Sequence, residues 1–173
     1  MTIISFKLGS WRFTFTMAPV VKVVGVNSIL SDGNHVLMWD FDDTKLEDVM
    51  DALIHVQAEY MLPPIYVLET KPGKNYIAYC FKKTEWRKAV EIVVSTPHVD
   101  WNFIKYSVYR GWFTLRVSEK DGRRPRLVHV IPSEVKEDCD LFDLRKWVKY
   151  ETLPSWYKGK RIEINVPEGV KIK

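Results

Sequence analysis

The stretch His35–Asp43, HVLMWDFDD, joins an apolar run to three acidic residues. The run Val36–Trp39 has the length and the side chains of a buried strand. The acids that follow it, Asp40, Asp42 and Asp43, have two interpretations. They are either solvated residues that open the next helix, or ligands of a metal ion.

The spacing of these acids separates their roles. Because residues two apart in a strand share a face, Asp40 and Asp42 project together, while Phe41 points into the packing. Neighbouring carboxylates raise each other's pKa unless a cation lies between them, and Mg²⁺ or Mn²⁺ prefers such oxygen ligands. Asp43 shares a face with neither. It precedes a helix, whose dipole a negative charge complements, so we assign it to the helix start.

The charge of the chain is unevenly distributed. The 173 residues are 46% hydrophobic and 13% aromatic, with a net charge of +4, which fits a globular protein. Residues 37–69 hold eight acids and one base, whereas residues 101–131 hold seven bases and two acids. An acidic half and a basic half suit a cation site beside an anion site; a soluble protein with uneven charge is the plainer interpretation.

The pattern of apolar residues and turns predicts an α+β fold, with helices packed on a mixed or antiparallel sheet. We expect one domain over residues 1–173, with a core at about 36–131 and a helix and strand within 139–166. Helices are predicted at Thr44–Tyr60, with Thr44 as its cap and Glu47 at the capping-box position, at Thr84–Ser95 and at Cys139–Tyr150. Strands are predicted at Trp11–Thr16, Val20–Val26, Val36–Phe41, Ile65–Thr70, Asn75–Phe81, Trp101–Ser107, Phe113–Ser118, Arg126–Ile131 and Lys160–Val166.

We expect a cytoplasmic protein from the N-terminal residues and the cysteines. The N-terminal residues alternate like strands and lack the basic start and long apolar middle of a signal peptide. No apolar stretch approaches the length of a membrane span, so no membrane partner is expected. Cys80 and Cys139 lie far apart, outside any CxxC pattern, and do not form a zinc site by themselves.

Three motifs, in order, resemble those of the archaeo-eukaryotic primase superfamily, in the style of its plasmid and viral members. VLMWDFDD is similar to the first motif, an apolar strand that ends in acid-x-acid. ETKPGKNYIAYCF is similar to the hairpin of the second motif, and HVDW to the third, which contributes Asp100. From Asp42 to Ile77 there are 35 residues, and 23 more lead to Asp100. The resemblance covers roughly residues 36–126.

This resemblance implies an RRM-like core and a primase or polymerase active in DNA replication. It implies that Asp40, Asp42 and Asp100 are catalytic residues that bind Mg²⁺ or Mn²⁺. Nucleoside triphosphates and single-stranded DNA are then the expected partners, with a helicase or other replication proteins. The basic region YRGWFTLRVSEKDGRRP supplies candidates for nucleotide phosphates, Arg116, Lys120 and Arg110, and for nucleic-acid phosphates, Arg123, Arg124 and Arg126. Trp101, Trp112 and Tyr109 are candidates for stacking on bases.

The second motif departs from the family at one position. Where the family has a histidine that helps to hold the phosphates of the nucleotide, this chain has Ile77. Lys71, Lys74 and Asn75 are nearby candidates for a substitute. The four histidines form no HxH or HxxxH pair, which argues against a zinc hydrolase and against replication-initiation nucleases.

Three hypotheses therefore remain open on the sequence. The first is an active, metal-dependent nucleotidyltransferase. The second is a catalytically inactive primase-fold subunit that binds nucleic acid or a replication partner, which the absence of the histidine favours. The third is an unrelated small α+β interaction protein, in which the acids only open a helix.

Overall fold

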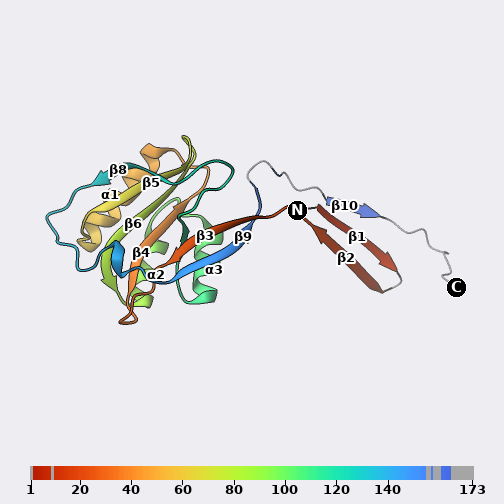
Figure 1. Cartoon of the computed structure of the whole chain (residues 1–173), viewed down its shortest axis with the longest axis horizontal. Helices are drawn as coiled ribbons and strands as arrows, with labels where there is room; N and C mark the ends of the chain where they lie inside the picture. Colours follow the sequence, from red (N-terminus) through yellow and green to blue (C-terminus); the bar gives the residue numbers. More distant parts are fainter. Residues whose placement is uncertain (1, 9, 155–156, 158–160, 165–173) are drawn as a thin grey trace. The chain divides into compact units, whose positions relative to one another are not determined.

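A computed structural model of the protein describes residues 2–8, 10–154, 157 and 161–164. The chain divides into two compact units, one of residues 1–22 and 151–173 and the other of residues 23–150 (Figure 1). The expected core at 36–131 lies within the larger unit. None of the helices in the described part of the chain has the length and apolar character needed to span a membrane.

The larger unit is α+β, as predicted. A four-stranded antiparallel sheet has the order β4-β6-β5-β8, formed by β4 (His35–Phe41), β6 (Asn75–Thr84), β5 (Ile65–Lys71) and β8 (Arg126–Ile131). A three-stranded sheet has the order β7-β3-β9, formed by β7 (Thr114–Arg116), β3 (Val21–Asn27) and β9 (Trp147–Thr152). The helices are α1 (Leu46–Tyr60), α2 (Trp86–Ser95) and α3 (Trp101–Arg110), with a single 3-10 turn η1 at Leu141–Asp143.

Strand β4 lies in the core although it is an edge strand of the four-stranded sheet. Residues Val36 to Trp39 are fully buried, and the indole of Trp39 donates to the hydroxyl of Thr96 at 2.9 Å. The outer edge of β4 is also bonded, because the amide of Val36 donates to the carbonyl of Ser28 at 2.9 Å. At its other end, the carbonyl of Asp40 accepts from the amide of Asp100 at 2.8 Å. Such bonds offset the cost of burying backbone groups at the edge of a sheet.

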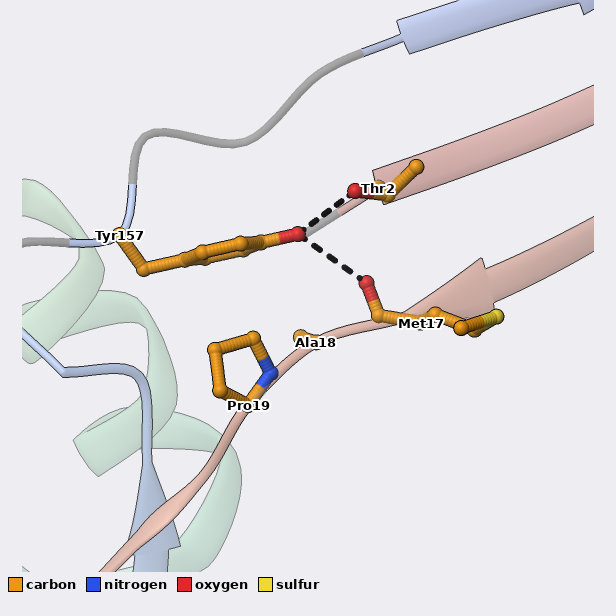
Figure 2. Close-up of a pocket in the computed structure, with 5 residues that line it drawn as sticks. All are labelled: Thr2, Met17, Ala18, Pro19 and Tyr157. Carbon is orange, nitrogen blue, oxygen red and sulfur yellow. Dashed lines mark hydrogen bonds between the residues drawn. The ribbon is translucent and has the colours of Figure 1, made fainter.

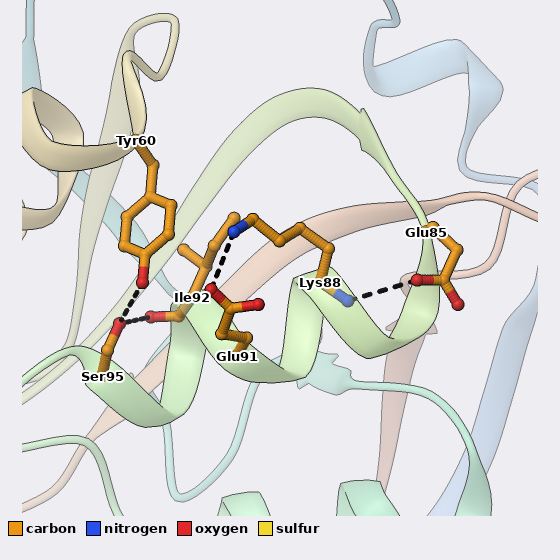
Figure 3. A network of polar contacts seen from close by, with 6 residues as sticks. All are labelled: Tyr60, Glu85, Lys88, Glu91, Ile92 and Ser95. Atoms are coloured by element: carbon orange, nitrogen blue, oxygen red, sulfur yellow. Dashed lines mark hydrogen bonds and ion pairs between the residues drawn. The ribbon is translucent and has the colours of Figure 1, made fainter.

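The helices α1 and α2 each bury apolar residues at helical spacing. Val49, Ala52, Leu53 and Val56 of α1 are buried, whereas Ile54 is exposed. In α2, Glu85 caps the helix and Lys88 pairs with Glu91 at 2.7 Å (Figure 3). The hydroxyl of Ser95 donates to Tyr60 at 3.4 Å, which joins the end of α1 to α2. These polar contacts stabilise the helical layer.

Two predicted elements are wrong in type. Trp101–Ser107, predicted as a strand, is helix α3, because the side chain of Asp100 caps it and Phe103, Ile104 and Ser107 are buried at helical spacing. Cys139–Tyr150, predicted as a helix, forms the turn η1 and most of strand β9. Asp140 and Asp143 satisfy each other's backbone amides in a capping box that closes after one turn.

The start of α1 also differs from the prediction. Thr44 does not cap it; its hydroxyl donates to the carbonyl of Asp42 at 3.0 Å, and the cap residue is Lys45, without a side-chain hydrogen bond. Asp43 has a φ of 49° and lies before the helix, outside its first turn. The second predicted helix begins at Trp86, since Thr84 still belongs to β6.

The smaller unit contains a three-stranded sheet with the order β10-β1-β2, from β10 (Arg161–Ile164), β1 (Thr2–Leu8) and β2 (Trp11–Met17). The β1–β10 pair is parallel and the β1–β2 pair antiparallel. Lys160, Asn165 and Val166, which complete the predicted last strand, lie outside the described residues. The hydroxyl of Tyr157 bonds to that of Thr2 at 2.7 Å and donates to the carbonyl of Met17 at 3.3 Å, beside a cavity of about 480 Å³ (Figure 2). Among the described residues, no predicted site residue lines this cavity.

Candidate active site

Strand β4 brings Asp40 to the face of the four-stranded sheet opposite the one that carries Leu37 and Trp39. In the register of the β4–β6 pair, Asp40 lies opposite Ile77, and Met38 opposite Tyr79. These side chains therefore share a face. Asp40 is half-buried and comes directly after the fully buried residues Val36 to Trp39 of the same strand. The sheet therefore holds its carboxyl group at the margin of the core.

Asp42 lies just beyond the end of β4 and contacts the next hairpin. The side-chain amide of Asn75 donates to its carboxylate, and the backbone amide of Thr44 donates to the carbonyl of Lys74 at 2.8 Å. The amide oxygen of Asn75 is buried and has no hydrogen-bond partner among the residues that the structure describes. Such an oxygen is costly unless a cation or a water molecule contacts it.

Asp100 reaches the site from a third element. Its backbone amide donates to the carbonyl of Asp40 at 2.8 Å. Its carboxylate caps helix α3 by accepting from the amide of Phe103 at 2.7 Å. The resemblance to the primase superfamily implied that Asp40, Asp42 and Asp100 act together. The structure brings all three to the end of β4, with the carboxylate of Asp100 engaged by its own helix.

The three acids are electrostatically coupled. Burial, followed by the charges of Asp42 and Asp100, raises the pKa of Asp40 to about 8, while Arg116 and Lys120 act in the opposite direction. Burial also raises the pKa of Asp42, although part of this residue is exposed to solvent, and Asp100 adds to the effect. A cluster of this kind binds a proton near neutral pH and is receptive to a cation.

Arg116 and Lys120 are the bases that face the acids. Burial lowers the pKa of each, and the charge of Asp40 partly restores it. Arg116 ends β7 and donates through one guanidinium nitrogen to the carbonyls of Ser118, at 2.5 Å, and Arg123, at 3.2 Å. Lys120 is bridged to Arg123 across the turn Asp121–Gly122 by two backbone hydrogen bonds. The turn therefore fixes the backbone of Lys120, and through the carbonyl of Arg123 it holds the guanidinium of Arg116.

Two tyrosines complete the surroundings of Asp40 and were not predicted as site residues. The hydroxyl of Tyr79 is buried and has no hydrogen-bond partner among the described residues. Tyr150 lies close enough to Tyr79 and Arg116 to influence the pKa of both. Tyr79 lies on this face because it is two residues from Ile77 along β6. Tyr150 was missed because its segment was assigned to a helix.

The remaining predicted bases lie farther from the acids. Arg110 ends α3, and its Nε donates to the carbonyl of Tyr106 at 3.0 Å. Arg123 and Arg124 are exposed in the hairpin that follows β7. Arg126 pairs with Glu69 at 3.2 Å on β8, three strands from β4, which is on the order of 14 Å across the sheet. Only Arg116 and Lys120 are thus brought to the acid cluster.

The residues present fit a divalent cation held jointly with a substrate. In the described part of the chain, no group of three or more His, Cys, Asp or Glu side chains is placed to hold a metal ion by itself. Asp40 and Asp42 nevertheless provide the hard oxygen atoms that Mg²⁺ or Mn²⁺ prefers. Mg²⁺ is commonly bound by one or two carboxylates together with substrate phosphates.

Comparison of the chain with protein-family models, with curated proteins and with solved structures gave no match.

Proposed function

We propose that the protein is a metal-dependent nucleotidyltransferase, a primase or polymerase that adds nucleotides on a single-stranded template. The observation that carries this proposal is the opposition of Asp40 and Asp42 to Arg116 and Lys120 at one end of the sheet. Acids there can hold a divalent cation, and bases there can meet a triphosphate. Nucleotidyl transfer requires both.

The order of the elements supports a primase-like core. The chain runs β4, α1, β5, β6, α2, and the three strands lie side by side in the order β4-β6-β5. This is the arrangement of a split β-α-β unit, to which RRM-like folds belong. The resemblance of the three motifs to the primase superfamily predicts the acids at the end of the first strand of that unit, where Asp40 and Asp42 lie.

The chemistry assigns a separate task to each group. Asp40 and Asp42 would hold Mg²⁺ or Mn²⁺, which supplies charge neutralisation to the phosphates of the substrate. Arg116 and Lys120 would neutralise the remaining phosphate charge and align the triphosphate. Asp100 fixes the end of β4 through its backbone and adds a third negative charge.

The exposed face of α3 is suited to single-stranded nucleic acid. Trp101 and Tyr109 are 68% and 89% exposed, and Tyr106 lies between them on the helix. Lys105 and Arg110 interleave with these aromatic residues, and the helix carries no acid. Proteins that bind single-stranded nucleic acid without sequence preference do so with aromatic side chains, on which the bases stack, and with basic residues that contact the backbone. Trp112, the third predicted stacking residue, is half-buried.

The test is incorporation of labelled nucleotides on a primed and an unprimed single-stranded DNA template, with Mg²⁺ or Mn²⁺. We expect metal-dependent synthesis by the wild type and loss of at least about 100-fold in an Asp40→Asn, Asp42→Asn variant, given the size of such electrostatic contributions. Asp43→Asn is the matched control, since it removes a neighbouring exposed acid. Full synthesis by the double variant would refute the site.

A second candidate function is that of an inactive primase-fold subunit that binds single-stranded DNA. Ile77, 3% exposed, lies directly opposite Asp40, where the resemblance requires a histidine. This candidate predicts salt-sensitive DNA binding without synthesis at any metal concentration. If the protein neither synthesises nucleic acid nor binds DNA at low salt, the third hypothesis, an unrelated α+β interaction protein, is favoured.

A further inference from the structure

A second feature of the same sheet face is a cavity of about 290 Å³ in the larger unit. Its walls are mainly apolar and aromatic. Tyr66, Tyr79 and Phe81 contribute rings from β5 and β6, and Trp147 contributes one from β9. Arg116 is the one charged residue among the described residues that line it. The volume lies at the lower limit of known small-molecule sites, which are typically about 300 to 1,000 Å³ and combine apolar walls with a few polar groups.

Tyr79 lines this cavity, but its hydroxyl oxygen is itself buried. The side chain is 7% exposed, and its hydroxyl has no hydrogen-bond partner in the described part of the chain. Buried hydroxyl groups are nearly always hydrogen-bonded, because leaving one unpaired is costly. A ligand that shifts the side chain of Tyr79 enough to reach this oxygen, and presents a donor or an acceptor to it, would remove that cost.

The cavity adjoins the acid cluster. Tyr79 lies opposite Met38, and the next position on the same face is the pair of Asp40 and Ile77. Diagonal neighbours of this kind are about 7 to 8 Å apart in a sheet. Arg116 belongs to both places, since it lines the cavity and its charge acts on Asp40. A molecule in the cavity that extends past Arg116 therefore arrives at the acids.

We infer that the cavity binds the nucleoside part of the nucleotide, base and sugar, with its phosphates directed past Arg116 toward Asp40 and Asp42. Planar bases match the aromatic rings of the walls, and their edges offer a hydrogen-bond partner to the hydroxyl of Tyr79, which has none among the described residues. The single positive charge of the lining lies on the side where the phosphates would be. This inference rests on the proposed function, because it names the second half of that substrate's site.

The experiment is titration calorimetry with unphosphorylated 2′-deoxyadenosine and thymidine, in the absence of metal. Tyr79→Phe keeps the ring and removes the hydroxyl, so we expect the affinity to fall by about threefold to tenfold. Leu127→Trp places a large ring at a cavity position that is 54% exposed and tolerant of substitution; we expect it to abolish binding. Tyr60→Phe, on the helical layer, is the matched control and should bind as the wild type does.

The outcomes separate this inference from the proposed function. Absence of nucleoside binding by the wild type, or binding that Leu127→Trp leaves unchanged, overturns the cavity assignment, even if nucleotides are incorporated. Nucleoside binding that Leu127→Trp abolishes supports the assignment, even if no synthesis is observed and the transferase function fails. Tyr79→Phe binding as tightly as wild type would overturn the role of its hydroxyl. Unfolding midpoints of all variants establish that each is folded.

Discussion

The backbone amide of Asp100 donates a hydrogen bond of 2.8 Å to the backbone carbonyl of Asp40, which fixes the first turn of α3 to the end of β4. The third acid is therefore positioned by main chain, and its side chain is engaged in capping the helix. Changes at Asp100 will consequently affect α3 as well as the charge of the cluster, which makes Asp40 and Asp42 the cleaner positions for testing chemistry.

The raised pKa of Asp40 predicts a specific dependence of stability on pH. The folded chain binds this proton with a pKa of about 8, whereas the ordinary value is 3.8. Between these values the folded state holds more protons than the unfolded chain, so the free energy of unfolding falls as pH rises from about 4 to about 8 and then levels off. Urea denaturation across this range should show a smaller fall for Asp40→Asn. Asp43→Asn should follow the wild type, and an unchanged slope in Asp40→Asn would contradict the prediction.

Placing a histidine at Ile77 should strengthen nucleotide binding. The side chain would lie opposite Asp40 on the face that carries the acids. One charge-assisted hydrogen bond to a phosphate contributes about 1.5 to 3 kcal/mol, so an increase in triphosphate affinity of about tenfold or more is expected at slightly acidic pH. The new polar group is buried, and some loss of stability should accompany it. Ile77→Val, which adds no polar group, controls for the loss of packing, and equal affinity in the two variants would contradict the prediction.

Arg116 should not be replaceable by lysine. Its guanidinium donates through a single nitrogen, Nη1, to two backbone carbonyls of the following hairpin, those of Ser118 and Arg123. The lysine side chain is one bond shorter than that of arginine and has no planar end group, so its nitrogen would not lie at the position of Nη1. We expect Arg116→Lys to lower the free energy of unfolding by about 0.5 to 1.5 kcal/mol, the net contribution of a hydrogen bond whose acceptor is partly open to water. Arg124→Lys, at a side chain that is 78% exposed, should leave the denaturation midpoint unchanged. Equal stability of the two variants would contradict the prediction that the hydrogen bonds of Arg116 stabilise the hairpin.

The aromatic and basic residues of α3 should contribute to DNA binding in different ways. Trp101→Ala and Tyr109→Ala each remove a stacking surface, and we expect each to weaken binding of an oligothymidine by about 1 to 3 kcal/mol without changing its salt dependence. Lys105→Ala should instead reduce the slope of log affinity against log salt by roughly one phosphate contact. Phe142→Ala removes an aromatic residue that is 86% exposed on η1 and should have no effect. Fluorescence anisotropy at several salt concentrations measures both quantities.

Local patterns predicted the central sheet and the acid pair. Strand β8 has the predicted bounds, and β4, β5 and β6 lie where alternation and turns placed them. Asp40 and Asp42 follow from a strand that ends abruptly in acids, a signal that needs no tertiary information. That Ile77 lies opposite Asp40 depends on the register of β4 and β6, which the structure supplies.

The errors arose where tertiary contacts decide between similar local patterns. Trp101–Ser107 is rich in aromatic and β-branched residues, yet the cap at Asp100 and the burial of Phe103 and Ile104 make it a helix. Trp147–Thr152 becomes a strand because β3 is available to pair with it. The cavity beside Tyr79 was not predictable, because its walls come from strands whose pairing the sequence does not specify.

The two-residue turn at Asp121–Gly122 has a consequence for how this chain tolerates insertions. Both residues have positive φ, 51° and 76°, and the flanking Lys120 and Arg123 exchange two backbone hydrogen bonds, which makes this the shortest kind of hairpin. Adding a single residue there would shift the pairing of the two arms of the hairpin by one residue, and the side chains of one arm would then point to the opposite face. Loop length, as much as residue identity, is therefore constrained here, and a one-residue insertion would carry the ammonium group of Lys120 away from the acids while leaving the composition of the chain almost unchanged.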